Sequence, residues 1–210
     1  MAATKAEKTS ARMTQSERTA LSDQRMFEAA ISLINERGTQ KTTLKEIGER
    51  AGYSRGLANY RFGSKEGLLQ ELFSRFDLHW KAHLEAYVAG LSGIDAVCGA
   101  ARALRDFLKA ESVYMRAMYI LWYESLGHES EILSRLADHH DVYRKDATKW
   151  IQQGIDAGEV HPDINPEQFA VQYCAFIFGT VYQWLVKAEA LDLDALFADY
   201  EANMIRLLKK

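Results

Sequence analysis

The chain has little that would interrupt a helix or cross-link one. Its 210 residues include two prolines, Pro162 and Pro166, in one short segment, so nearly every other stretch keeps the amides and free φ angles that helices need. The only cysteines, Cys98 and Cys174, have no partner at the spacing of a metal or redox motif. We therefore expect long helices and two buried, reduced thiols.

Long hydrophobic runs are also missing. Residues 1–19 are polar and basic and lack the apolar centre of a signal peptide. The most apolar run, residues 173–182, is about half of the roughly 20 residues that a membrane-spanning helix needs. Hydrophobic residues form 48% of the chain and charged residues 26%, the balance of a soluble globular protein. We expect a cytoplasmic protein with no membrane-spanning part.

The motifs of common enzyme classes are absent too. There is no glycine-rich phosphate loop, no nucleophile elbow, no HExxH, no pair of CxxC units and no paired Glu-x-x-His of a di-metal bundle. Residues 138–141, Asp-His-His-Asp, are of metal-binding types, but neighbours on a helix point about 100° apart, so a solvated polar face is the preferred interpretation. His128 and His161 are expected in loops. We predict no enzyme activity, with no catalytic residue, metal or cofactor.

Charge is divided unevenly along the chain. Residues 1–63 carry a formal charge of +4 and the remainder −7, which together give the overall −3. A mildly basic N-terminal part on an acidic remainder suits binding of phosphate at one end only.

The spacing of apolar residues predicts an all-α fold without internal repeats. In the first helix, Phe27, Ala30, Ile31 and Ile34 recur on one face, with Ser22 and Asp23 as expected caps. The expected helices are 22–37, 44–51, 54–61, 64–84, 94–108, 112–125, 129–157 as one helix or two, 166–188 and 193–208, with a loop over 157–166.

Two short helices are predicted to meet at a tight turn. Thr43 and Glu46 have the spacing of a reciprocal capping box, Gly52 suits a left-handed turn, and Ser54 and Ser64 suit the starts of the next two helices. Such a pair forms either a helix-turn-helix, whose second helix enters the major groove, or simply two helices of a larger bundle with a basic face. Periodicity alone does not decide between them.

The residues themselves favour the first alternative. The residues that carry the signal are Ala29-Ala30, Gly38, Thr42-Thr43, Ile47, Ala51-Gly52, Ser54, Gly56, Phe62, Ser64-Lys65-Glu66 and Leu68-Leu69. With these residues in unbroken register, residues 25–69 resemble the DNA-binding head of the tetracycline-repressor (TetR) family. The resemblance implies a three-helix head joined by a long fourth helix to a C-terminal ligand-binding and dimerisation body. We expect a flexible polar arm over 1–20, the head over 21–66 and the body over 67–210.

The resemblance also implies which residues contact DNA. Thr43 and Lys65 would hold phosphates, and both lie at helix starts, where free amides favour anions. The recognition helix would offer Arg55, Leu57, Asn59, Tyr60 and Arg61. Arg55 is the best candidate for reading a guanine. Many family members have an aromatic residue where this chain has Asn59, so the roles of positions 59 to 61 stay open, and Gly48 in place of the usual alanine suggests close helix packing.

The body is expected to hold a small-molecule effector and the dimer contact. The last two helices, 166–188 and 193–208, would pack against their copies, since a monomer would leave an apolar surface in water. Candidate pocket residues are Tyr114, Met118, Tyr119, Trp122, Tyr143, Trp150, Tyr173 and Phe176. The alternative for each is that it belongs to the plain core.

We therefore expect a ligand-responsive repressor that leaves a palindromic DNA operator when a small molecule binds the body. The alternative is a helical small-molecule-binding module without sequence-specific DNA binding. The effector, the operator and the choice between repression and activation are not encoded in any motif found here.

Overall fold

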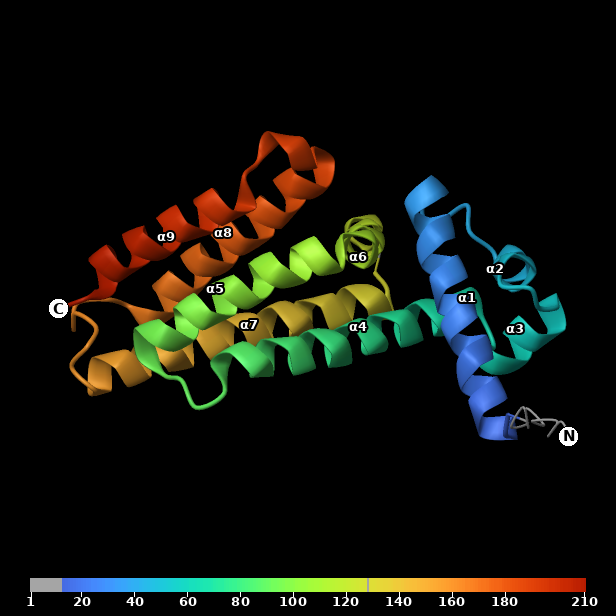
Figure 1. Cartoon of the computed structure of the whole chain (residues 1–210), viewed down its shortest axis with the longest axis horizontal. Coiled ribbons are helices and arrows are strands. Elements are labelled where there is room, and N and C mark those ends of the chain that lie inside the picture. The colour runs from blue at the N-terminus through green and yellow to red at the C-terminus, as the bar shows by residue number, and fades with distance from the viewer. Residues whose placement is uncertain (1–12, 128) are drawn as a thin grey trace, which may run out of the picture.

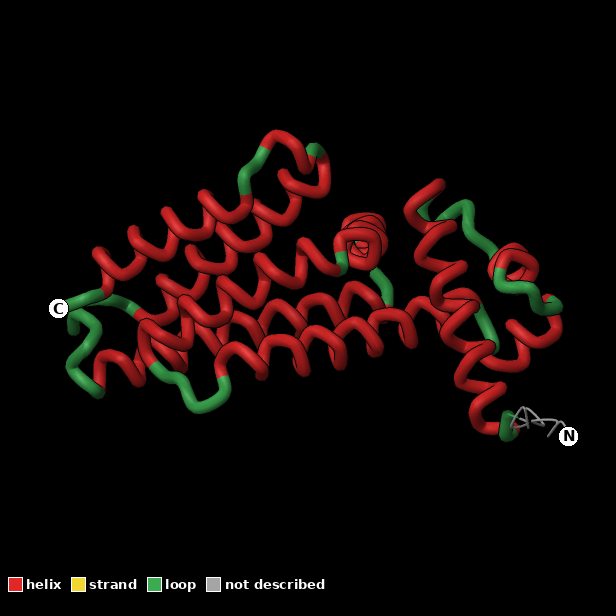
Figure 2. The backbone as a smooth tube through the Cα atoms, viewed as in Figure 1, coloured by secondary structure: helices red, strands yellow, loops and turns green. Residues whose placement is uncertain are grey.

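The computed structural model describes residues 13–127 and 129–210, and helices dominate this part of the chain (Figures 1 and 2). The helices are α1 (Gln15–Arg37), α2 (Leu44–Arg50), α3 (Arg55–Phe62), α4 (Lys65–Val88), α5 (Gly93–Ala110), α6 (Ser112–Ser125), α7 (Glu131–Asp156), α8 (Pro166–Val186), the 3₁₀ turn η1 (Ala188–Ala190) and α9 (Leu193–Leu208). In the described residues, extended pairing is limited to a single bridge between Val160 and Lys209. The expected all-α fold is confirmed.

Two groups of helices are joined by α4 (Figure 1). Helices α1 to α3 form a small head, and α4 runs from this head along one side of a larger body made of α5 to α9. The segment expected as one helix or two is the single helix α7. The loop predicted between α7 and α8 is present and contains His161, as expected, whereas His128 lies outside the described residues.

The first helix begins earlier than the sequence suggested. Thr14 caps α1 and exchanges hydrogen bonds with Glu17, so this pair sets the helix start. The expected caps Ser22 and Asp23 are wrong: both are buried within the helix, where the Ser22 hydroxyl donates to the Thr19 carbonyl at 2.8 Å. Residues 15–20 of the expected flexible arm are therefore helical, and residues 1–12 lie outside the described part.

The other predicted helix starts in the head are confirmed. The Glu46 amide donates to the Thr43 hydroxyl at 3.3 Å, and the Glu46 carboxylate accepts from the Thr43 amide at 3.2 Å. Ser54 accepts from the Leu57 amide at 3.2 Å and Ser64 from the Gly67 amide at 3.0 Å. Each hydroxyl thus satisfies an amide that the first turn of its helix would leave free.

A single continuous core extends from the head into the body. Helix α6 crosses close to α1 and is seen end-on in Figure 1. Asn35 of α1 donates from Nδ2 to the Val113 carbonyl of α6 at 2.9 Å, and Glu124 near the other end of α6 accepts from the Thr39 amide at 2.9 Å. The head is thus bound to the body through α6 as well as through α4.

Helix α8 is the most apolar element. Its length and composition would allow it to cross a membrane, a property shared by core helices of globular proteins. Here it packs along α7 with Phe169, Tyr173 and Val181 buried. Cys98 and Cys174 are both buried free thiols, as predicted.

Candidate functional site

The turn between α2 and α3 brings the two helices into close contact. Gly52 has φ +82° and provides the left-handed turn that was predicted. The Tyr53 amide donates to the Gly48 carbonyl at 2.8 Å, and a Cβ at Gly48 would lie 3.1 Å from the Ser54 carbonyl oxygen. This close approach supports the interpretation of Gly48 as a packing residue and fixes the angle at which α3 leaves α2.

Helix α3 presents a polar outer face. Arg55 and Asn59 are exposed, and Tyr60 is 83% exposed, whereas Ala58 is fully buried against the head core. Tyr60, the aromatic residue next to Asn59, therefore faces solvent. Arg55 forms no ion pair within the described residues, so its guanidinium is available to a partner.

Leu57 and Phe62 occupy the inner side of α3. Both are half-buried and pack against the core, and the Phe62 ring meets the Phe27 ring edge-on at 5.3 Å. This packing gives the pair of helices the small apolar inner core that a helix-turn-helix needs. It leaves Leu57, which was also a candidate for groove contact, with only part of its side chain free.

Arg61 is held by the head itself. Its Nε donates to Oδ1 of Asp23 at 2.8 Å, and its Nη2 donates to Oδ2 of the same carboxylate. This hydrogen bonding raises the pKa of Arg61. Because Asp23 lies in α1 and is buried, the pair ties α3 to α1, a role that the candidate DNA contact was not predicted to have.

The two candidate phosphate-binding residues lie at helix starts, as expected. Thr43 is exposed at the start of α2, where its hydroxyl lies 2.7 Å from Oε2 of Glu46. That carboxylate also pairs with Arg37 at 3.0 Å, which offsets its charge. Lys65 is half-buried at the start of α4, and its Nζ donates to the Thr39 carbonyl at 3.3 Å.

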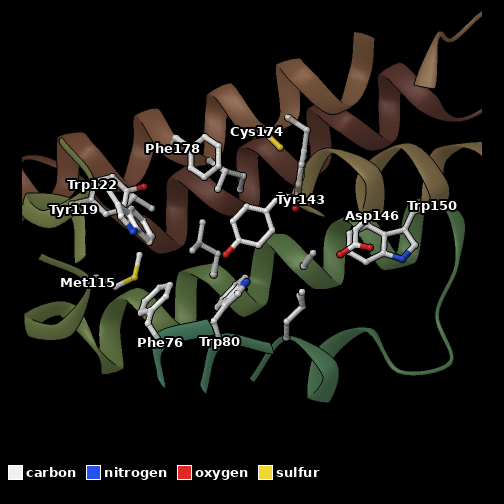
Figure 3. Close-up of a pocket in the computed structure, with 16 residues that line it drawn as sticks. Phe76, Trp80, Met115, Tyr119, Trp122, Tyr143, Asp146, Trp150, Cys174 and Phe178 are labelled. Carbon is white, nitrogen blue, oxygen red and sulfur yellow. The ribbon is translucent and has the colours of Figure 1, made fainter. Parts of the chain in front are cut away.

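The body contains a cavity of about 60 Å³ lined by residues of α4, α5, α6, α7 and α8 (Figure 3). The structure places five of the eight candidate pocket residues on its wall. They are Tyr119, Trp122, Tyr143, Trp150 and Tyr173. Figure 3 shows the Tyr143 ring between Trp122 and Trp150, with Phe76 and Trp80 below it and Phe178 and Cys174 above.

The other three candidates lie away from the cavity. Met118 is fully buried in the core, and the Tyr114 hydroxyl donates to the Leu72 carbonyl at 2.9 Å. Phe176 stacks on Tyr200 of α9, with ring centroids 3.4 Å apart. These three side chains contact neighbouring helices and do not line the cavity.

The pocket candidates chosen from the sequence included none of the α4 wall and omitted one charged residue. Phe76, Trp80 and Leu84 line the cavity from α4, and Asp146 lines it from α7. A signal for Asp146 was present, since it follows Tyr143 by three residues and precedes Trp150 by four, which places all three on one helix face.

Two polar groups on the cavity wall lack hydrogen-bond partners among the described residues. The indole Nε1 atoms of Trp80 and Trp122 are buried and have no hydrogen-bond partner among the described residues. Burial raises the pKa of Asp146, while the charges of Lys149 and Lys81 act in the opposite direction. Burial also raises the pKa of Tyr143 far above its usual range, so its phenol stays protonated.

The histidines of residues 138–141 are not the solvated face that was expected. The His139 ring packs 4.4 Å from the Tyr143 ring, and its Nδ1 lies 2.9 Å from Oδ1 of Asp77 on α4. His140 stacks on Phe178 with centroids 4.4 Å apart. The two rings are thus packed against different helices. Three potential metal ligands come together nowhere in residues 13–127 and 129–210.

Two helices, α4 and α6, connect the cavity wall to the head. Helix α4 carries Trp80 of the wall and begins at Lys65 in the head. Helix α6 carries Trp122 of the wall and, two residues later, Glu124, which accepts hydrogen bonds from both the amide and the hydroxyl of Thr39. A displacement of either wall helix would therefore reach the residues that position α2 and α3.

The chain is similar in sequence and in fold to known bacterial regulatory proteins. Residues 27–72 match the family model described as bacterial regulatory proteins, tetR family. The HTH-type transcriptional regulator TtgR of Pseudomonas putida is 25% identical over 176 residues, which cover 80% of this chain and 82% of the relative. The fold is similar to that of NalD, the secondary repressor of the MexAB-OprM multidrug efflux pump in Pseudomonas aeruginosa, with a TM-score of 0.74, 21% identity and coverage of 91% and 98%. It is also similar to SmeT in a complex with triclosan, with a TM-score of 0.73, 20% identity and coverage of 90% and 92%.

Proposed function

Because the chain belongs to the tetR family of bacterial regulatory proteins, we propose that it is a cytoplasmic repressor that releases a palindromic operator when a small molecule enters the cavity of the body. The observation that carries the proposal is the outer face of α3, where Arg55, Asn59 and Tyr60 are exposed beside a basic head. These residue types bind base edges and phosphates in the major groove. A sensing module without DNA binding would have no use for this face.

The candidate DNA-binding residues of the head differ in their proposed roles. Arg55 at the first turn of α3 reads a base, and Asn59 and Tyr60 contact a base or a phosphate beside it. Thr43 and Lys65 bind phosphates at the starts of α2 and α4, where unpaired amides and the helix dipole favour an anion. Arg61 orients α3 through Asp23 rather than touching DNA.

The size of the cavity suggests how an effector would act. About 60 Å³ is less than the roughly 150 Å³ cavity that holds benzene, so a larger molecule must move the walls apart. The walls include α4 and α6, which lead to Lys65 and Thr39 in the head. Effector binding therefore favours a body conformation whose heads no longer fit the operator, and by linkage the operator weakens effector binding by the same factor.

A homodimer through α8 and α9 would place two heads on one DNA site. Both helices present small or apolar residues along one face. On α8 these are the exposed Val171, Ala175, Tyr182 and Val186 with the half-buried Gly179, and on α9 they are the exposed Ala195, Ala198, Ala202 and Ile205. Such a surface is stable when it is covered by its copy, and a two-fold dimer reads half-sites about 34–36 Å apart.

Selection of duplexes from a random-sequence library tests the proposal without knowledge of the operator. The purified protein is expected to enrich an inverted repeat whose half-sites are one helical turn apart. The Arg55→Ala variant should enrich a motif with one base position relaxed in each half-site. If the native protein enriched no sequence motif, the repressor proposal would be wrong and the small-molecule-binding module without sequence-specific DNA binding would be favoured.

A further inference from the structure

The chemistry of the cavity wall is uneven. Of the sixteen described residues that line it, Asp146 is the only one that carries a charge at neutral pH (Figure 3). The remaining wall is apolar and rich in aromatic rings, several of them tryptophan or tyrosine. A carboxylate in such surroundings attracts a positive charge, and the ring faces add to that attraction.

The Asp146 carboxylate makes no stabilising polar contact among the described residues. It has neither a hydrogen bond nor an ion pair in the part of the chain that the structure describes, although Lys81 and Lys149 are close enough to act on its charge. Burial raises its pKa, which means that the carboxylate disfavours folding instead of stabilising it. A partner supplied from outside would remove this cost.

The position of Asp146 also suits access from solvent. An open groove of about 500 Å³ between α4 and α7 shares four residues with the cavity, namely Trp80, Leu84, Tyr143 and Asp146. These side chains line both spaces. A ligand that enters from the groove would therefore pass the Asp146 carboxylate on its way to the apolar wall.

Other ligand charges fit less well. Within the cavity, an anion would face the Asp146 carboxylate and could gain only the neutral indole N–H groups of Trp80 and Trp122 and the phenol of Tyr143, because Lys81 and Lys149 do not line the cavity wall. A wholly apolar ligand would leave these groups without partners, which costs free energy in a buried site. A cationic ligand with an apolar body satisfies the carboxylate, and an oxygen on that body would satisfy the indole groups.

We propose that the effector is an amphipathic aromatic cation, an amine or ammonium group on an apolar ring body, and that Asp146 is its counter-ion. This inference rests on the proposed function, because it names the chemistry of the effector. The ammonium group lies at the cavity edge beside Asp146, and the ring body enters among Tyr143, Trp80 and Trp122.

Three probes of the same shape and different charge test the inference. They are 1-naphthylmethylamine, which is a cation at neutral pH, the neutral 1-naphthylmethanol and the anion 1-naphthoate, each titrated calorimetrically into the full-length protein. The cation is expected to bind about tenfold more tightly than the alcohol. The Asp146→Asn variant should lose this preference while keeping the affinity for the alcohol.

Asp138→Asn is the matched control. Asp138 lies on the same helix and lines the same groove, but it does not reach the cavity, so this variant should keep the preference for the cation. Equal binding of amine and alcohol, tighter binding of the naphthoate, a preference that survives in Asp146→Asn, or binding of none of the probes would each overturn the inference. An inverted repeat enriched in the duplex selection would then still support the repressor, so the two failures are distinguishable.

Discussion

The ion pair between Arg61 and Asp23 is expected to contribute to the stability of the head. Removal of the arginine leaves the Asp23 carboxylate buried without its two donors. We expect Arg61→Ala to destabilise the protein by about 2 kcal/mol, measured by urea unfolding followed by circular dichroism.

The double variant Asp23→Asn, Arg61→Ala separates this role from DNA binding. It should recover part of the stability, because the uncompensated charge is gone. A stable Arg61→Ala protein whose affinity falls equally for all duplexes would instead make Arg61 a phosphate contact.

Arg55 is predicted to act through the shape of its guanidinium. Arg55→Ala should lower affinity for the selected operator by about 1–3 kcal/mol and relax the preference at one base position in each half-site, measured by fluorescence anisotropy on a set of single-base variants. Arg55→Lys is the control, since it keeps the charge and loses the planar fork. If the lysine variant retained full base preference, Arg55 would be a phosphate contact.

At the scale of elements, α6 is the most direct link from the cavity to the head. Its Glu124 carboxylate accepts from the Thr39 amide and hydroxyl in the loop before α2. Glu124→Ala should make the amides of residues 38–43 exchange about tenfold faster in hydrogen–deuterium exchange, because loss of this acceptor favours local opening.

Glu129→Ala is the matched control, because Glu129 is exposed beyond the end of α6 and carries the same charge. Unchanged exchange at residues 38–43 in Glu124→Ala would mean that α6 does not hold this loop.

Elements with local signals could be predicted from the sequence. The starts at Thr43, Ser54 and Ser64 depend on a hydroxyl and an amide three residues apart, which a linear pattern shows. The start of α1 was wrong because Ser22 and Asp23 also look like caps. The contact that buries Asp23 comes from Arg61, 38 residues along the chain, and no local pattern contains it.

The cavity was also predictable only in part, because it too depends on contacts between residues far apart in the sequence. Helical spacing identified Tyr143 and Phe176 alike as inward-facing aromatic residues, yet Tyr143 faces the cavity and Phe176 stacks on Tyr200. Which buried ring meets empty space depends on the packing of five helices. Asp146 was passed over because a single carboxylate on a polar helix is usually solvated.

At the scale of the whole molecule, the exposed faces of α8 and α9 should determine the oligomeric state. Gly179 lies within the apolar face of α8, and space beside its Cα is open, so Gly179→Arg adds a charge there without a clash inside the protomer. We expect this variant to sediment as a monomer and to bind the operator about 100-fold more weakly, since two linked heads bind more tightly than one.

Gln152→Arg on the exposed surface of α7 is the control and should remain dimeric. A dimeric Gly179→Arg protein with full operator affinity would place the interface elsewhere.

The most direct test of the account is a titration of the protein against a fluorescent duplex from the DNA that flanks its own gene, beside a scrambled duplex, at two salt concentrations. The account predicts tight binding to the native duplex, much weaker binding to the scrambled one, and affinities for both that fall as salt rises. No binding to either duplex even at low salt would contradict it, because the exposed face of α3 would then have no DNA to read.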